Sequence, residues 1–184
     1  MFFKRVLFLG VASSLLLTSC AAITKILPDK KAVSVLSGRE AVDGQVLAVK
    51  IDDTNNAHPQ IGLEDADVVY IEQVEGGLTR IAAVFSSVIP MRIGPVRSAR
   101  ISDIEIMNQY GRVAFAYSGA QKKLLSVIAA ANLQNLGAQA QSPTIYTTDP
   151  ARKAPFAMVL RADLLMQKII DKAYVIDTAR SVGW

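Results

Sequence analysis

The chain has very few of the residues that build metal centres and nucleophilic active sites. Its 184 residues include one cysteine, Cys20, and one histidine, His58. One cysteine cannot form an internal disulfide, and one cysteine with one histidine cannot form a Cys/His zinc site. The sequence has no Gly-x-Ser-x-Gly nucleophile motif, and the oxygen-rich residues 52–56 lack the glycine and distal glutamate of an EF-hand loop. We therefore expect neither a metal nor a cofactor.

Long apolar runs and dense basic runs are absent as well. The uncharged stretch over residues 6–17 has 12 residues, which is too short to cross about 30 Å of hydrocarbon as a helix. The formal net charge is +4, and Lys4 and Arg5 supply two of these charges. Because no Lys/Arg cluster is interleaved with aromatic residues, we expect no nucleic-acid partner. Apolar residues make up 51% of the chain, which is enough for one domain with its own core.

The N-terminus resembles a bacterial lipoprotein signal. Lys4 and Arg5 form a basic start, residues 6–17 form a short apolar region, and Thr18-Ser19 precede Cys20. In such signals the peptide is cut before the cysteine, whose thiol carries a diacylglyceryl group, and two or three acyl chains such as palmitate hold the protein firmly. We expect residues 1–19 to be a signal peptide and Cys20 to anchor the protein to the cell membrane on its extracytoplasmic face. The alternative is an uncleaved anchor with an ordinary cysteine.

The rest of the chain alternates strand patterns with helical patterns. Residues 20–44 mix Lys, Asp, Pro, Ser and Gly without periodicity, which is typical of a tether, so we expect the folded domain over residues 45–184. Strand patterns on both sides of Gly76-Gly77 favour a hairpin. The alternation predicts an α/β or α+β fold in which helices pack on a mixed β-sheet. The expected strands cover residues 46–51, 68–71, 79–86, 113–117, 145–146 and 174–176, and the expected helices cover 98–110, 121–132 and 162–172.

The densest charged motif contains Arg92, Arg97 and Arg100, on a Gly-Pro loop ahead of a predicted helix. A guanidinium group matches phosphate or carboxylate, and a helix N-terminus would add free N–H groups. Ser98 is a candidate N-cap for that helix. Alternatively, the arginines pair with carboxylates as ordinary surface charges. The candidate partners are Glu64, Asp65, Asp67, Glu72 and Glu75.

A second motif surrounds Gly76-Gly77, with Glu75 before the pair and Thr79-Arg80 after it. A glycine pair beside a carboxylate and an arginine can mark close backbone approach to a ligand. It can also mark only a turn that needs positive φ, and the motif by itself favours this second interpretation.

In this order and spacing, the motifs resemble the YerB-like bacterial lipoproteins, a family of uncharacterised function. The resemblance runs from about residue 45 to residue 158 and implies a second domain after this one, so we expect this chain to hold the first domain alone, as a shortened or truncated product. His58 stands where the family has an arginine, and Phe156 follows Ala154-Pro155 where the family usually has a His-Asn pair. The matching segments are residues 47–53, 59–60, 66–70, 74–80, 94–100 and 117–119.

The resemblance favours a binding site over chance surface pairing. We expect an envelope lipoprotein whose domain binds an anion through Arg80, Arg97, Arg100 and Ser98, with Glu75 orienting the arginines. A cell-wall polymer or a phosphorylated precursor is the expected ligand class.

Two alternatives remain open at this stage. One is an enzyme similar in outline to the LytR-CpsA-Psr phosphotransferases, with arginines on a polyprenyl diphosphate and Asp52, Asp53 or Asp67 holding Mg²⁺. The other is an envelope protein-interaction scaffold, which full pairing of the arginines with carboxylates would favour.

Overall fold

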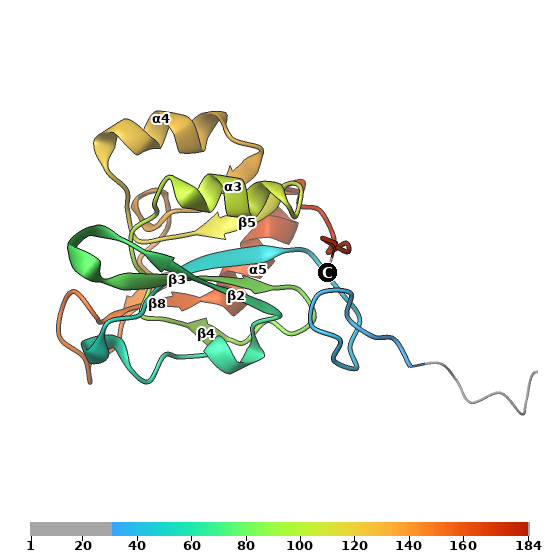
Figure 1. Ribbon diagram of the computed structural model, residues 1–184, viewed down its shortest axis with the longest axis horizontal. Helices are drawn as coiled ribbons and strands as arrows, with labels where there is room; N and C mark the ends of the chain where they lie inside the picture. The colour runs from blue at the N-terminus through green and yellow to red at the C-terminus, as the bar shows by residue number, and fades with distance from the viewer. Residues whose placement is uncertain (1–30, 184) are drawn as a thin grey trace, which may run out of the picture. The chain divides into compact units, whose positions relative to one another are not determined.

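A five-stranded mixed sheet with the strand order β2-β3-β1-β5-β6 forms the centre of the fold (Figure 1). The computed structural model describes residues 31–183, so Cys20 and the signal segment lie outside the described residues. β3 runs antiparallel to both β2 and β1, whereas β1, β5 and β6 run parallel to one another. The strands are β1 (Leu47–Asp52), β2 (Val68–Gln73), β3 (Thr79–Phe85), β5 (Val113–Ala116) and β6 (Leu133–Asn135).

A smaller antiparallel sheet has the order β4-β8-β7. It is joined to the loops around the first sheet, since Ile61 bridges Gly94 and the N–H of Val96 donates to the carbonyl of Met158 at 2.8 Å. Its strands are β4 (Arg92–Ile93), β7 (Tyr146–Thr148) and β8 (Met158–Arg161).

Helices and the smaller sheet cover the two faces of the central sheet, as Figure 1 shows. On one face, Ala48 of β1 joins a buried cluster with Met107 of α3 (Ser102–Asn108) and Ile128 of α4 (Lys122–Ala130). On the other face, Leu47 joins a cluster with Leu165 of α5 (Ala162–Asp171). Successive strand residues point to opposite faces, so β1 contributes to two cores because all six of its residues are buried. The short 3-10 helices are η1 (Asn55–Ala57), η2 (Leu63–Asp65), η3 (Glu75–Gly77) and η4 (Ala138–Ala140).

The fold also takes in residues ahead of Gln45. Leu36 is buried, the Ser37 hydroxyl donates to Asp67 Oδ1 at 2.5 Å, and Arg39 donates to the carbonyl of Ala66 at 3.1 Å. These contacts fix the segment against the loop before β2. No helix within residues 31–183 has the length and apolar character needed to cross a membrane.

The mixed α+β architecture and the β2–β3 hairpin are confirmed. Two element predictions are wrong. The helix expected from residue 98 begins at Ser102, because the residues before it are extended and hydrogen-bonded to β1. Residues 174–176 form no strand, and the backbone pairs instead two residues further on, where Thr178 bridges Gln45.

Candidate functional site

Charged side chains gather at one edge of the central sheet, where the parallel strands β1, β5 and β6 have their carboxyl ends. β2 runs in the same direction, and β3 begins at this edge. Asp52 at the end of β1 and Glu72 near the end of β2 both pair in register with Arg80 of β3. Residues paired across a strand ladder face the same side, so these three side chains lie on the face that α3 covers. The carboxyl edge of parallel strands is the usual ligand position in open α/β sheets.

The segment over residues 95–99 lies between β1 and the loop that follows β5. The N–H of Arg97 donates to the carbonyl of Lys50 at 2.8 Å, and the N–H of Ser118 donates to the carbonyl of Arg97 at 2.9 Å. The N–H of Ala99 donates to the carbonyl of Gly119 at 2.9 Å. Because this segment is committed to strand-like hydrogen bonds, Ser98 is not a helix N-cap, and the start of α3 contributes no N–H groups beside Arg97. That part of the sequence interpretation is wrong.

Arg97 lies against the end of β1. Its Nε is 2.6 Å from Oδ2 of Asp52, a carboxylate that is 1% exposed. Both atoms are buried, and neither has a partner in hydrogen-bonding geometry among the described residues, so their contact is an ion pair without a directed hydrogen bond. The guanidinium also lies 5.9 Å from the ring centre of Phe156, within cation–π range.

Arg100 reaches in the opposite direction, toward the β2–β3 turn. Its Nε and Nη2 donate to Oε2 of Glu75 at 3.0 and 2.8 Å, and its Nη1 donates to the carbonyl of Ala99 at 3.0 Å. The amide of Gln121 donates to the other Glu75 oxygen at 3.3 Å. The backbone N–H of Glu75 and then Arg100 lower the pKa of this exposed carboxylate. The Gly76-Gly77 pair supplies the turn, with both residues at positive φ.

Arg80 is half-buried and has no carboxylate within ion-pair distance among the described residues. Its Nη1 donates to the backbone carbonyl of Ser98 at 3.0 Å. Burial, followed by repulsion from Arg100 and Arg97, lowers the pKa of Arg80. The three arginines are therefore close enough to repel one another, and one of them is not neutralised by a partner of its own.

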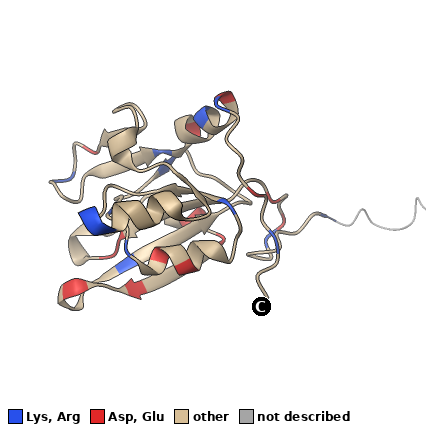
Figure 2. Ribbon diagram, turned by 90° about the horizontal axis from the view of Figure 1, so that it is seen from above, with Lys and Arg blue, Asp and Glu red and all other residues tan. Residues whose placement is uncertain are grey.

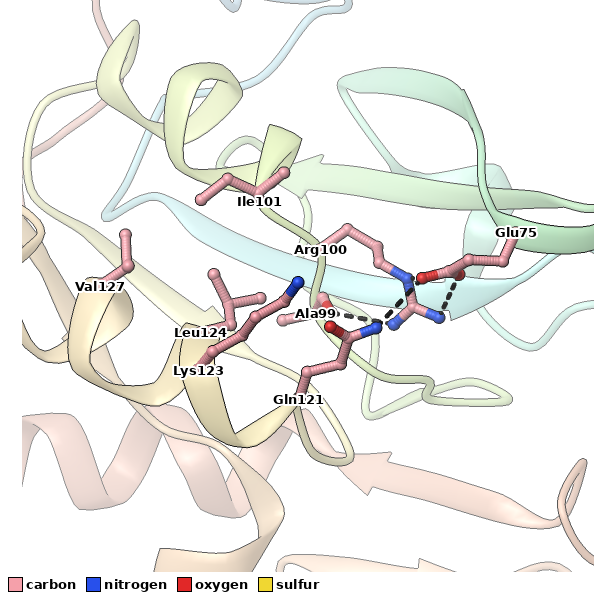
Figure 3. Close-up of a pocket in the computed structure, with 8 residues that line it drawn as sticks. All are labelled: Glu75, Ala99, Arg100, Ile101, Gln121, Lys123, Leu124 and Val127. Carbon is pink, nitrogen blue, oxygen red and sulfur yellow. Dashed lines mark hydrogen bonds and ion pairs between the residues drawn. The ribbon is translucent and has the colours of Figure 1, made fainter.

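Arg100 and Arg97 line two separate pockets. Arg100 lines a pocket of about 420 Å³ with Gln121, Lys123 and an apolar wall (Figure 3). Arg97 lines a second pocket of about 340 Å³, together with Ser118 and Thr148. Arg92, the third arginine of the motif, is exposed in β4 of the smaller sheet and lines neither pocket.

A buried ionic cluster that the sequence patterns did not predict lies beside the arginines. Lys50, which is fully buried, bonds to Glu72 and lies 2.7 Å from Oδ1 of Asp103. Oδ2 of Asp103 accepts the backbone N–H of Arg100 at 2.6 Å, and the Ser102 hydroxyl donates to Glu72. Removal from water raises the pKa of Asp103 to about 6, and Lys50 opposes this shift. The cluster ties the arginine segment to β1 and β2. The one signal available in the sequence was the lysine in the otherwise apolar strand run before Asp52.

The aspartates proposed as magnesium ligands do not come together. Asp52 pairs with Arg97, Asp53 accepts from Thr79 at 2.7 Å, and Asp67 lies at the opposite edge, where it accepts the N–H groups of Ser86 and Ser87. Within the described part of the chain, no three His, Cys, Asp or Glu side chains form a metal-ligand group.

Comparison with known proteins places the chain in a family. Residues 35–175 match the family described as "Protein of unknown function (DUF3048) N-terminal domain". The chain belongs to this family. The YerB-like resemblance of its motifs is confirmed by this match together with the two that follow.

Two comparisons with Bacillus subtilis proteins give the extent of the likeness. The chain is 34% identical over 120 residues to "Putative lipoprotein YerB" of strain 168, a match over 60% of this chain and 36% of that protein. A crystal structure of the YerB protein superimposes with a TM-score of 0.71 at 25% identity, over 81% of this chain and 53% of the other. The chain thus matches about a third to a half of the length of these relatives.

Proposed function

We propose that this protein is a membrane-anchored lipoprotein of the cell envelope whose domain binds an anionic ligand through Arg80, Arg97 and Arg100. The observation that carries the proposal is that these side chains lie near one another at the carboxyl edge of the sheet, where Arg97 and Arg100 line two separate pockets and both lower the pKa of the partly buried Arg80. Asp52 and Glu75 offset the charges of Arg97 and Arg100, whereas Arg80 has no carboxylate within ion-pair distance among the described residues, so an added anion would offset its charge. A ligand with phosphate groups would do so.

The state of Arg97 gives the second argument for an anion. Buried polar atoms without a hydrogen bond are rare in folded proteins, and each needs a physical explanation. Nε of Arg97 lies 2.6 Å from Oδ2 of Asp52 without a directed hydrogen bond, and the guanidinium borders a pocket with two hydroxyl side chains, Ser118 and Thr148. A phosphate oxygen in that pocket would accept from the guanidinium and from both hydroxyls. Charge-assisted bonds of this kind are the strong ones in proteins.

The location of the protein rests on its relative and on the N-terminal sequence. The curated relative is described as a putative lipoprotein, and Cys20 of this chain follows a basic start and a short apolar region. Anchoring through Cys20 would place the domain on the extracytoplasmic face of the membrane. The anionic polymers of the cell wall and their phosphorylated precursors are the ligand class available there.

A binding screen tests the proposal. The full chain, purified in phosphatidylcholine nanodiscs, is dialysed to equilibrium against labelled phosphate, pyrophosphate, polyphosphate and wall-polymer fragments. We expect at least one of these anions to bind, with weaker binding in Arg100→Ala. If none binds, or if Arg100→Ala binds as the wild type does, the proposal is wrong.

Phosphoryl transfer is a second candidate function at the same site. The observation that favours it is the burial of Asp52 directly beside Arg97, since a carboxylate next to a bound phosphate can take the proton of an attacking hydroxyl. Turnover of a lipid-linked diphosphate that is lost in Asp52→Asn would support it. Retained binding without turnover would leave the binding function alone.

A third candidate, a role as a protein-interaction scaffold, is less well supported. Pairing of every arginine with a carboxylate would have favoured it. Arg97 and Arg100 are paired, but Arg80 bonds only to a backbone carbonyl among the described residues.

A further inference from the structure

We infer that the Arg100 pocket takes an amphiphilic phosphate, an anionic headgroup attached to an alkyl chain, rather than a free inorganic anion. This inference rests on the proposed function and names the ligand class of one of its two pockets. The observation behind it is that cationic and amide groups line one part of the pocket and apolar side chains line the rest (Figure 3).

The polar part of the pocket contains a cation that the proposed anion site had not included. Lys123, in the first turn of α4, directs its ammonium group into the space in front of residues 99–101 (Figure 3). No hydrogen bond or ion pair joins that ammonium to another side chain of the described residues. Lys123 and the amide of Gln121, both at the start of α4, together with Arg100 before α3, provide hydrogen-bond donors for one headgroup. Figure 2 shows this basic first turn of α4 at the same end of the molecule as the acidic turn between β2 and β3.

Glu75 does not close the pocket to an anion. It holds Arg100 in place, but its side chain is 60% exposed, and ion pairs at such exposure contribute little because water and salt screen them. Its turn contains Gly76 and Gly77, which have no neighbouring atoms within 4 Å of where a side chain would begin. A phosphate monoester carries up to two charges and can therefore replace the single carboxylate on Arg100.

The remaining wall of the pocket is apolar. Ala99 and Leu124 form its buried part, while Ile101 is 62% exposed and Val127 is 39% exposed. Apolar surface that remains in water loses the free energy of burial, and an alkyl chain packed against Ile101 and Val127 would recover part of it. The volume of about 420 Å³ lies within the range of roughly 300 to 1,000 Å³ that small-ligand sites show. An inorganic anion would leave this wall uncovered.

Photolabelling tests the inference on the full chain in phosphatidylcholine nanodiscs. The probe is dodecyl phosphate with a diazirine in its chain, and the matching diazirine alcohol is the neutral comparison. We expect the phosphate probe to label peptides that contain Ile101 or Val127, and the alcohol not to label them. Lys123→Gln is expected to lower labelling about tenfold, the size of one lost charge-assisted contact. Lys122→Gln removes the same charge from the neighbouring position, which does not line the pocket, and should leave labelling unchanged.

A second pair of variants tests the apolar wall. Ile101→Ser should weaken dodecyl phosphate several-fold without changing the binding of inorganic pyrophosphate, whereas Ile170→Ser, at a similarly exposed position on α5, should change neither. The inference is overturned if the alcohol labels as well as the phosphate does, or if Lys123→Gln behaves like Lys122→Gln. If pyrophosphate binds through Arg100 while dodecyl phosphate has no advantage over it, the inference fails and the proposed function stands. If neither binds, both fail.

Discussion

Asp103 uses its two carboxylate oxygens to connect the arginine segment with the interior. Oδ1 pairs with the buried Lys50, and Oδ2 accepts the backbone N–H of Arg100. Lys50 also bonds to Glu72, so one buried cation faces two carboxylates. When all three groups are ionised the cluster carries an uncompensated negative charge. Burial is the largest cause of the raised pKa of Asp103, about 6 against an ordinary 3.8, and the charge of Glu72 adds to it.

This pKa predicts a pH dependence of stability. Between pH 4 and pH 6 the folded protein holds a proton on Asp103 that the unfolded chain has released, so the contribution of Asp103 to the free energy of unfolding falls as the pH rises. Asp103→Asn mimics the protonated side chain and should lack this trend. Urea unfolding at pH 4, 5, 6 and 7 should therefore show the variant gaining stability relative to the wild type as the pH increases. A constant difference between the two proteins over this range would contradict the account.

The comparison between wild type and variant is needed because other carboxylates act in the opposite direction. Hydrogen bonds from Ser37, Ser86 and Ser87 lower the pKa of Asp67 despite partial burial, so its contribution is lost as the pH falls through that lowered pKa. Asp67 is common to both proteins, and its effect cancels in the difference.

At the level of single residues, the sequence predicted the arginines better than their partners. Arg97 and Arg100 stand in one short motif, so their proximity is local. The contact of Lys50 with Asp103 joins residues 53 positions apart and depends on where α3 crosses β1, which neither local pattern specifies. In the sequence alone, Lys50 is a typical residue of a half-exposed strand, and Asp103 is a typical residue of the first turn of a helix. Neither residue therefore indicates a buried ion pair.

The elements that the sequence failed to predict are short and depend on distant partners. β4 has two residues and β6 has three, and each exists because it pairs with β8 or β5. Such segments are too short for an alternating pattern to be recognised. The longer elements were predicted to within one or two residues, because β1 and β3 are mostly apolar runs and α5 has an amphipathic pattern.

Two glycines with the same backbone conformation allow a test of the contact between the turn before η2 and the backbone of β4. Gly62 and Gly76 both have φ of +72°, but a Cβ at Gly62 would lie 2.5 Å from the carbonyl oxygen of Arg92, whereas a Cβ at Gly76 would meet nothing within 4 Å. Alanine at either position costs about 1 to 2 kcal/mol for the left-handed backbone. Gly62→Ala should cost about 1 to 3 kcal/mol more, because backbone must move to make room. Thermal or urea unfolding measures both variants, and equal losses would show that the Arg92 contact is not as close as described.

At the scale of the whole domain, the candidate site and residues 37–44 lie at opposite ends of the central sheet. The site occupies the carboxyl edge of β1, while Gly44 bonds to Ser86 just beyond the far end of β3 (Figure 1). None of residues 32–44 lines either arginine pocket.

Cys20 is the residue on which the membrane location depends. Cys20→Ser should abolish acylation and leave the signal segment uncut, because the lipid is attached to a thiol and the serine hydroxyl does not replace it. Mass spectrometry of the membrane fraction should find a wild-type N-terminal peptide that begins at Cys20 and carries acyl mass. An unmodified Cys20 thiol in the mature protein would overturn the proposed location.

The central claim is that the arginines at the carboxyl edge bind an anion, and equilibrium dialysis of labelled pyrophosphate against the full chain in nanodiscs tests it most directly. Arg100→Ala removes one contact, Arg97→Lys keeps the charge beside Asp52 but removes the guanidinium fork, and Arg92→Ala removes the same charge type from the smaller sheet. We predict that the first two variants each lose about 1.5 to 3 kcal/mol of binding free energy and that Arg92→Ala binds like the wild type. Equal binding by all four proteins, or an equal loss in all three variants, would contradict the account.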